Sequence, residues 1–214
     1  MLADADLPLV LGVTGASAQQ LAVRALQLLL DAGASVDLVA SRGAALVWQT
    51  ELGLALPTEP ARQEAFWRER TGSSGGCLRC HRWSDQAARV ASGSFRTRGM
   101  LILPCTMGSV GRIAAGVALD LVERCADVHL KEGRALLIAP REMPWSLVHL
   151  RNLTTLAEAG ARIVPPIPAW YQRPESIDDM VDFLVVRMLD GLGYDLGGIH
   201  RWQGPITALP EGER

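Results

Sequence analysis

Short apolar runs of strand length alternate along this chain with longer segments in which apolar residues recur at helical spacing. Strands are predicted at residues 7–14, 35–40, 99–104, 135–139 and 162–164, and helices at residues 18–32, 44–52, 110–115, 146–159 and 178–192. This alternation is typical of a parallel sheet with helices on both faces. We therefore expect an α/β fold: a doubly wound parallel sheet in three α/β/α layers, with ligands bound beyond the carboxyl ends of the strands.

The alternation is lost between residues 57 and 90, where prolines, a charged stretch and a run of small residues follow one another. Such a composition favours a surface insertion or a mobile loop. The chain has 214 residues, of which 49% are hydrophobic, enough for one sizeable core. We expect a single domain over residues 1–214, with a variable loop at 57–90 and a closing tail at 196–214.

The overall charge excludes some classes of partner. The 21 basic and 23 acidic residues give a formal net charge of −2, so no broad positive field attracts nucleic acid or an anionic membrane. Four cysteines are too few for a disulfide framework in a chain of this length, which favours a reducing compartment. The first residues are acidic where a signal peptide carries basic ones, and no apolar run reaches membrane-spanning length. A cytoplasmic protein is predicted.

Small and hydroxyl-bearing residues follow three of the predicted strands. They are Gly15-Ala16-Ser17, Ser41-Arg42 and Thr106-Met107-Gly108-Ser109. A strand that enters a helix through such residues presents backbone N–H groups where the helix dipole is positive, which suits a phosphate. The same hydroxyls also serve as ordinary helix N-caps, and one such turn alone does not separate the two interpretations.

Charged and aromatic residues add candidate chemistry. Lys131, Arg141 and Glu142 place cations and a carboxylate at what we expect to be neighbouring strand ends, where they suit phosphate binding and proton transfer. Arg187 lies on an apolar helix face, where burial requires an acid or an anionic ligand. Tyr171 follows a proline-rich loop, and Trp202 stands in the tail. For each, a solvated turn or ordinary packing is the alternative.

The cysteines offer weaker signals. Cys77-Leu78-Arg79-Cys80-His81 has the spelling of a c-type haem attachment site, but that chemistry requires an exported chain. A zinc site lacks a second ligand pair nearby, so no metal is predicted. Cys105 stands at the expected pocket rim without a histidine close in sequence, and a buried cysteine is ordinarily inert.

Three longer strings, in order along the chain, carry a resemblance to a known family. They are 126–132 (ADVHLKE), 140–144 (PREMP) and 165–174 (PPIPAWYQRP). With the turns described above, they resemble the UbiX/Pad-type flavin prenyltransferases, within the wider homo-oligomeric flavin-containing cysteine decarboxylase fold. The similarity runs from about residue 8 to residue 195 and is poor near 57–90. It implies a Rossmann-like, flavodoxin-like sheet.

The resemblance also implies roles for individual residues. FMN-binding roles fall on Gly15, Ala16, Ser17, Ser41, Thr106, Met107, Gly108, Ser109 and Arg141. Roles in binding the prenyl phosphate fall on Lys131, Arg141, Tyr171 and Arg187, with Trp202 closing the site. Glu142 is implied as the acid/base residue, with Ser17, Lys131 and Glu51 completing the catalytic group. Reduced FMN and dimethylallyl phosphate are then the substrates, and prenylated FMN, made for a UbiD-type decarboxylase, is the product. A homo-oligomer, a dodecamer, with its site between subunits is implied, and no metal.

Two positions depart from the family pattern. Ala18 stands where the family commonly has glycine, and Gly108 stands where many members have lysine, which removes one positive charge beside the cofactor. Two other functions stay open. One is an FMN-dependent decarboxylase of the same fold, which requires a histidine after the first helix, where only Gln19-Gln20 is found. The other is a non-catalytic flavin-binding or carrier protein.

Overall fold

The computed structural model describes residues 7–197, which form a three-layer α/β/α structure around one parallel sheet. The sheet has six strands in the order β3-β2-β1-β4-β5-β6, and all neighbours pair in parallel. The strands are β1 (Leu9–Val13), β2 (Ser35–Ala40), β3 (Cys77–His81), β4 (Gly99–Cys105), β5 (Leu136–Pro140) and β6 (Arg162–Ile163). Every residue of β1, β4 and β5 is buried, as expected for central strands covered on both faces.

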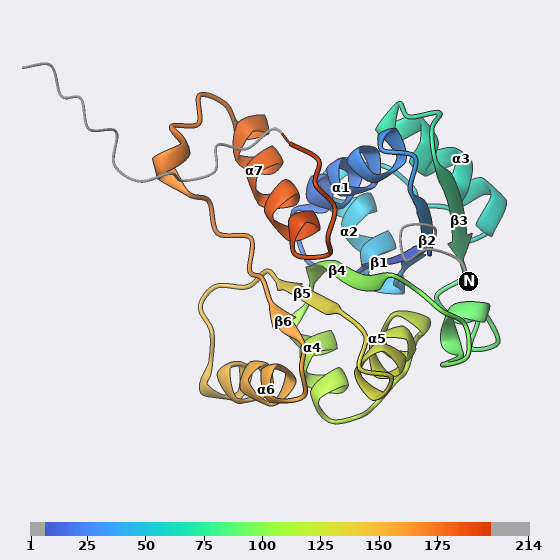
Figure 1. The fold of residues 1–214 in the computed structure, drawn as a ribbon, viewed down its shortest axis with the longest axis vertical. Coiled ribbons are helices and arrows are strands. Elements are labelled where there is room, and N and C mark those ends of the chain that lie inside the picture. Colours follow the sequence, from blue (N-terminus) through green and yellow to red (C-terminus); the bar gives the residue numbers. More distant parts are fainter. Residues whose placement is uncertain (1–6, 198–214) are drawn as a thin grey trace, which may run out of the picture.

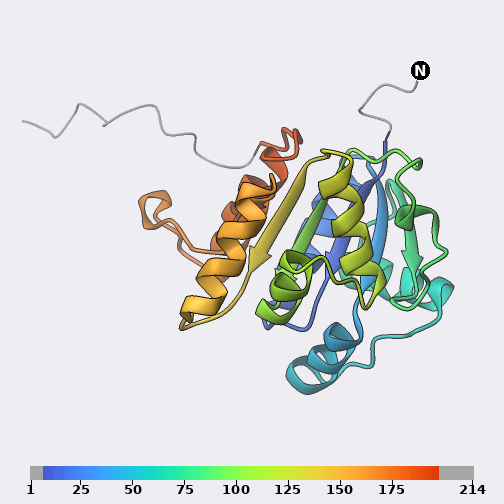
Figure 2. The same ribbon diagram turned by 90° about the horizontal axis from the view of Figure 1, so that it is seen from below.

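Helices cover both faces of the sheet, so the expected doubly wound, flavodoxin-like fold is confirmed (Figures 1 and 2). On one face lie α1 (Gln19–Asp31), α2 (Arg42–Leu52), α3 (Pro60–Thr71) and α7 (Ile177–Asp190). On the other lie α4 (Met107–Ala114), α5 (Leu121–Lys131) and α6 (Leu147–Glu158). Each face has its own apolar cluster: Leu26, Leu29 and Trp67 belong to the first, and Val122, Ile138 and Leu156 to the second.

The prediction of a loop at residues 57–90 is wrong for its two ordered parts, α3 and β3. Helix α3 packs through Trp67, which is fully buried and makes edge-on ring contacts with Trp48 and Phe66. Strand β3 extends the sheet by pairing in parallel with β2. The helix was missed because adjacent aromatic residues, and no long apolar stripe, attach it to the core. Its charged residues suggested a solvated loop.

Helix α5 was also missed, because two of its inward-facing positions are polar. Glu123 and His129 are both buried, although neither belongs to an apolar pattern. The His129 imidazole lies 2.8 Å from the Thr97 hydroxyl through Nε2 and 2.7 Å from the Cys125 carbonyl oxygen through Nδ1. Both ring nitrogens are therefore satisfied inside the protein.

Burial lowers the pKa of His129 from its ordinary value. The unfolded chain takes up a proton at this histidine below about pH 6.5, whereas the folded chain does so only at a lower pH. We therefore expect the free energy of unfolding to fall as pH drops below that value, with the full contribution of His129 present above it. Urea unfolding between pH 7 and pH 5 measures the slope. We expect His129→Asn to make this pH dependence of the free energy of unfolding flatter. His149→Gln, in α6 and only partly buried, is the control and is expected to change the pH dependence less. Equal changes in the two variants would contradict the argument.

The Cys-Leu-Arg-Cys-His string lies in β3, where it serves the fold. His81 Nε2 lies 2.7 Å from Asp37 Oδ1, and Arg89 donates to both oxygens of the same carboxylate at 2.8 and 2.9 Å. Asp37 is completely buried, so the Arg89 guanidinium compensates its charge, and His81 adds a hydrogen bond. Among residues 7–197, no three His, Cys, Asp or Glu side chains gather in a way that suits a metal ion. No helix within that range is both long and apolar enough to cross a membrane.

Candidate functional site

The carboxyl ends of the parallel strands meet at one edge of the sheet, which we call the rim. The chain turns there after β1, β2, β4 and β5, and the neighbours of β1 are β2 on one side and β4 on the other. From β1 the chain adds strands β2 and β3 on one side and then β4, β5 and β6 on the other. In such folds the point between β1 and β4, where this order reverses, opens a crevice for ligands. The predicted FMN-binding residues all lie on turns or helix starts of this rim.

Close backbone packing defines the turn after β1. A methyl group on Gly15 would lie 2.7–2.8 Å from backbone atoms of Gly43, at the start of α2, so only glycine fits. The Thr14 hydroxyl donates to the Pro104 carbonyl at 2.9 Å and accepts from the Thr106 N–H at 2.8 Å. The three turns after β1, β2 and β4 are thus held together by direct contacts, which fixes the spacing of their polar groups.

Ser17 and Glu51, two of the predicted catalytic residues, meet at the rim. The Ser17 hydroxyl donates to Glu51 Oε2 at 3.0 Å, although 34 positions separate the residues along the chain. Gln19, two residues after Ser17, is fully buried and donates through Nε2 to the carbonyls of Thr14 and Ala16. Gln19 therefore braces the turn at the place where a decarboxylase of this fold was expected to need a histidine.

Ala18 adopts a left-handed conformation, with φ 78° and ψ 41°, at the N-cap of α1 and without a side-chain capping bond. This conformation costs a residue with a β-carbon about 1–2 kcal/mol. We expect Ala18→Gly to raise the free energy of unfolding by about 0.5–1 kcal/mol, after the extra entropy of glycine in the unfolded chain is subtracted. Ala32→Gly, at the other end of α1 with φ −78°, is the control and is expected to destabilise. Chemical denaturation tests both; a loss of stability in Ala18→Gly would contradict the argument.

The hydroxyls of Ser41 and Thr106 cap helices, as the simpler interpretation of these residues predicted. Ser41 Oγ accepts from the Ala44 N–H at 3.2 Å, and Thr106 Oγ1 accepts from the Ser109 N–H at 3.1 Å. Both residues nonetheless face a cavity of about 300 Å³, which we call the rim pocket. Its lining residues are Gly15, Ser41, Arg42, Gly43, Trp83, Thr106, Ser109, Arg112, Leu119 and Asp120. Capping and ligand binding are therefore compatible here.

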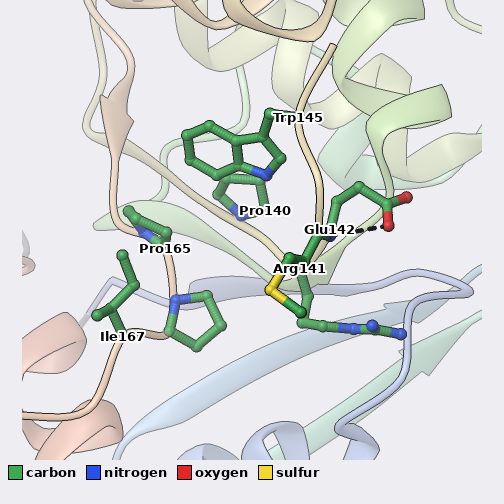
Figure 3. A pocket seen from close by; sticks show the side chains of 8 residues that line it. Pro140, Arg141, Glu142, Trp145, Pro165 and Ile167 are labelled. Carbon is green, nitrogen blue, oxygen red and sulfur yellow. Dashed lines mark hydrogen bonds between the residues drawn. The ribbon is translucent and has the colours of Figure 1, made fainter.

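A second cavity, of about 620 Å³, lies at the ends of β5 and β6, and we call it the proline pocket. Its lining residues are Pro140, Arg141, Glu142, Met143, Trp145, Pro165, Pro166 and Ile167. Figure 3 shows Arg141 and Glu142 pointing away from Pro165 and Ile167, which form the opposite wall. The Arg141 N–H donates to the Cys105 carbonyl at 3.0 Å, which holds Arg141 beside the turn after β4. A guanidinium and a carboxylate thus line an apolar cavity at the rim.

Lys131 lies at the amino-terminal ends of the strands, whereas Arg141 and Glu142 lie at the carboxyl ends. The expectation that all three stand at neighbouring strand ends is therefore wrong. Lys131 is the last residue of α5, directly before β5, whereas Arg141 follows β5. The length of that strand separates them by about 16 Å. Lys131 pairs with Glu132 at 3.2 Å and borders the Ser92–Ser94 turn at Gly93.

Tyr171 and Arg187 form another separate group. Tyr171, in the short helix η3 (Trp170–Gln172), makes an edge-on contact with Phe183 of α7, and Arg187 lies one turn further along α7. Arg187 is about half exposed and pairs with Asp190 at 3.0 Å, which supplies the acid expected for it. The segment that carries Tyr171, residues 164–176, extends away from the sheet (Figures 1 and 2). Trp202 lies outside the described residues.

Cys105 ends β4 at the rim but is completely buried. Burial raises the pKa of its thiol far above the ordinary value, so it does not form a thiolate at neutral pH. Its Sγ contacts the carbonyl oxygen of Thr106 at 3.6 Å. The structure therefore agrees with the expectation of an inert cysteine and provides no nucleophile here.

Comparisons with known proteins agree with this geometry. The family model described as flavoprotein matches residues 3–189. A flavin prenyltransferase UbiX of Synechocystis sp. is 54% identical over 198 residues, which cover 92% of this chain and 96% of the relative. This chain belongs to the UbiX family of flavoproteins. The family resemblance inferred from the sequence is thus confirmed, while the role of each site residue stays a prediction.

Two solved structures of the UbiX family share the fold over nearly their whole length. The crystal structure of AnUbiX in complex with FMN and dimethylallyl pyrophosphate has a TM-score of 0.81 and 36% identity, and covers 92% of this chain and 97% of that chain. A dodecameric FMN-dependent UbiX-like decarboxylase from Escherichia coli O157:H7 has a TM-score of 0.79 and 41% identity, and covers 92% of this chain and all of the other.

Arg112 is a rim residue that the sequence interpretation missed. It lines the rim pocket from α4, and its Nε donates to Glu123 at 2.6 Å. A signal was present in the sequence, because Arg112 stands one helical turn after Gly108, where the family's lysine is absent. Residues four positions apart lie on the same face of a helix, so the charge of Arg112 can take the place of a lysine charge at position 108.

Proposed function

We propose that this chain is a flavin prenyltransferase that transfers the dimethylallyl group of dimethylallyl phosphate to N5 and C6 of reduced FMN. The observation that carries the proposal is that Arg141 and Glu142 line the apolar proline pocket directly after β5, in a chain that is 54% identical to a named flavin prenyltransferase. The product is prenylated FMN, and we propose a UbiD-type decarboxylase as its recipient.

The rim pocket fits the phosphate end of FMN. It combines the hydroxyl groups of Ser41, Thr106 and Ser109 with the guanidinium groups of Arg42 and Arg112. The pocket lies at the start of α4, where N–H groups of the first turn and the helix dipole favour an anion. When bound, reduced FMN supplies the nucleophilic N5 and C6 positions. The donor set thus matches a phosphate monoester held at one end of the rim.

The neighbouring residues suit the transfer itself. The carbon–oxygen bond of dimethylallyl phosphate breaks, phosphate leaves with the electron pair, and C1 of the dimethylallyl unit bonds to N5, which loses its proton. The double bond of that unit then takes up a proton at C2, and its C3 bonds to C6, which loses its own proton. Arg141 is placed to stabilise the charge that develops on the departing phosphate. Glu142 is placed to move the proton. The apolar walls of the proline pocket keep water from the allylic carbon.

We further propose that the complete site forms between subunits of a homo-oligomer. Lys131, Tyr171 and Arg187 lie on other parts of the surface than Arg141, so a single chain does not assemble the predicted phosphate ligands. Several large apolar side chains near the proline pocket and residues 164–176 are exposed: Met143, Leu147, Val148, Ile167, Trp170 and Ile177. Exposed apolar surface of this kind favours protein contacts, and the similar Escherichia coli protein is dodecameric.

The proposal is tested by anaerobic incubation of the purified chain with reduced FMN and dimethylallyl monophosphate. A flavin heavier by one five-carbon unit is expected by mass spectrometry. Replacing the monophosphate by the diphosphate in a parallel reaction identifies the donor, because AnUbiX was crystallised with the pyrophosphate. Folded, FMN-bound protein that yields no five-carbon product with either donor would refute the transferase.

An FMN-dependent decarboxylase is the second candidate, because the similar protein from Escherichia coli O157:H7 is described as one. Gln19 argues against it, because this residue stands where the decarboxylase requires a histidine. Gln19 is buried and donates both amide hydrogens to carbonyls of the turn after β1. Release of carbon dioxide from a cysteine-terminated peptide, with no prenylated flavin, would favour this function. The cytoplasmic location and the identity of the recipient decarboxylase stay predictions.

A further inference from the structure

We propose that Arg112 binds the phosphate of the flavin directly and thereby makes the rim pocket select FMN over unphosphorylated riboflavin. The proposal rests on the proposed function, since it takes FMN as the ligand. It concerns a residue that neither the turn motifs nor the family resemblance pointed to, and it follows from three features of the pocket: how Arg112 is anchored, what Gly108 leaves open, and how the charges are distributed.

Arg112 is anchored by one side of its guanidinium. Its Nε donates to Glu123 Oε1 at 2.6 Å, and its Nη2 lies 3.4 Å from Ser109 Oγ. Glu123 is almost completely buried, and its other oxygen accepts from the Leu119 N–H at 2.8 Å. Among residues 7–197, no acceptor lies within hydrogen-bonding distance of Arg112 Nη1. A fixed carboxylate therefore orients the guanidinium and leaves donors for a ligand.

Gly108 leaves the space beside these donors open. A methyl group at position 108 would lie 3.3 Å from Arg112 Nη1 and 3.8 Å from Thr106 Oγ1. Any longer side chain at this position would therefore crowd the guanidinium and the capping hydroxyl at the start of α4. Because position 108 has no side chain, Arg112 and the first turn of α4 can contact the same anion.

The charges around the pocket favour Arg112 over the other groups as the phosphate partner. Arg42 also lines the pocket but is exposed, so water and salt screen its charge. Asp120 lines the pocket as well, and burial raises the pKa of its carboxyl, which accepts from the Glu123 N–H. Glu123 compensates the charge of Arg112 in the absence of a ligand. The guanidinium of Arg112 is therefore already ordered before a phosphate binds, and its side chain does not have to move.

The test is the affinity of the chain for FMN and for riboflavin, measured by quenching of flavin fluorescence. We expect Arg112→Gln to raise the Kd for FMN by about 10- to 100-fold, the loss typical of a charge-assisted hydrogen bond. The Kd for riboflavin is expected to stay within about twofold, because riboflavin has no phosphate. An unchanged FMN affinity, or equal losses for both flavins, would overturn the assignment.

Two further variants keep the outcome interpretable. Arg112→Gln leaves Glu123 buried without its partner, so the double variant with Glu123→Gln removes both charges and preserves a neutral, packed site; it is expected to show the same selective loss. Arg24→Gln is the matched control, because Arg24 is similarly exposed and pairs with Asp182 away from the rim. It is expected to leave both affinities unchanged. If the unaltered chain binds neither flavin, the proposed function fails; if Arg112→Gln retains the preference for FMN, only the role of Arg112 fails.

Discussion

Glu142→Gln is expected to lower the rate of prenyl transfer by about 10²- to 10⁴-fold, the usual contribution of a positioned acid/base residue. Glutamine has nearly the same shape but cannot carry the proton that leaves C6 of the flavin. Glu142 also accepts the N–H of Met143 at 3.0 Å, and the glutamine side-chain oxygen can accept the same bond. The local turn is therefore preserved, and the loss falls on the chemical step.

The rate is measured anaerobically with saturating reduced FMN and prenyl donor, and FMN affinity is measured separately. The Kd for FMN is expected to change by less than about threefold, because Glu142 borders the proline pocket and not the rim pocket. Glu158→Gln, at the end of α6 and away from the rim, is the control and is expected to retain full activity. A Glu142→Gln variant that transfers the prenyl group at the normal rate would show that this carboxylate is not the acid/base residue. If the Glu142→Gln variant transfers no prenyl group but still replaces the unaltered chain in the cell, the protein acts as a carrier of the flavin and not as a transferase.

The central sheet was predictable because its strands are apolar on both sides. In β1, β4 and β5 no polar residue interrupts the apolar run. The turns after β1 and β4 contain glycine and hydroxyl residues. Elements that depend on few or atypical contacts were not predictable. Helix α3 packs through Phe66 and Trp67, and α5 buries Glu123 and His129.

The rim residues of the site were predictable for the same reason as the sheet. Parallel strands bring all their carboxyl ends to one edge, so Gly15, Ser41, Thr106 and Arg141 had to be close. Lys131 and Arg187 lie near helix ends, and no periodicity of the sequence places them beside Arg141. Their predicted roles depend on the homo-oligomer that we propose.

Asp37→Asn is expected to have the largest effect on stability, a loss of about 3 kcal/mol in the free energy of unfolding. Asp37 is completely buried in β2 and receives Arg89 through both oxygens and His81 through one. Asparagine keeps the volume but removes the charge. The Arg89 guanidinium, stacked 4.6 Å from the centre of the Phe95 ring, is then left beside the core without its counter-charge.

Asp182→Asn is the matched control for this prediction. Asp182 also receives an arginine through both oxygens, from Arg24 at 2.6 and 2.8 Å, but both side chains are more than 30% exposed. Water solvates the Arg24 guanidinium after the charge of Asp182 is removed, so the expected loss in the free energy of unfolding is about 0.5–1 kcal/mol. Urea denaturation of both variants measures the difference. If Asp37→Asn costs no more than Asp182→Asn, burial is not what makes the Asp37 ion pairs strong, and the β2–β3 edge owes its stability to apolar packing alone.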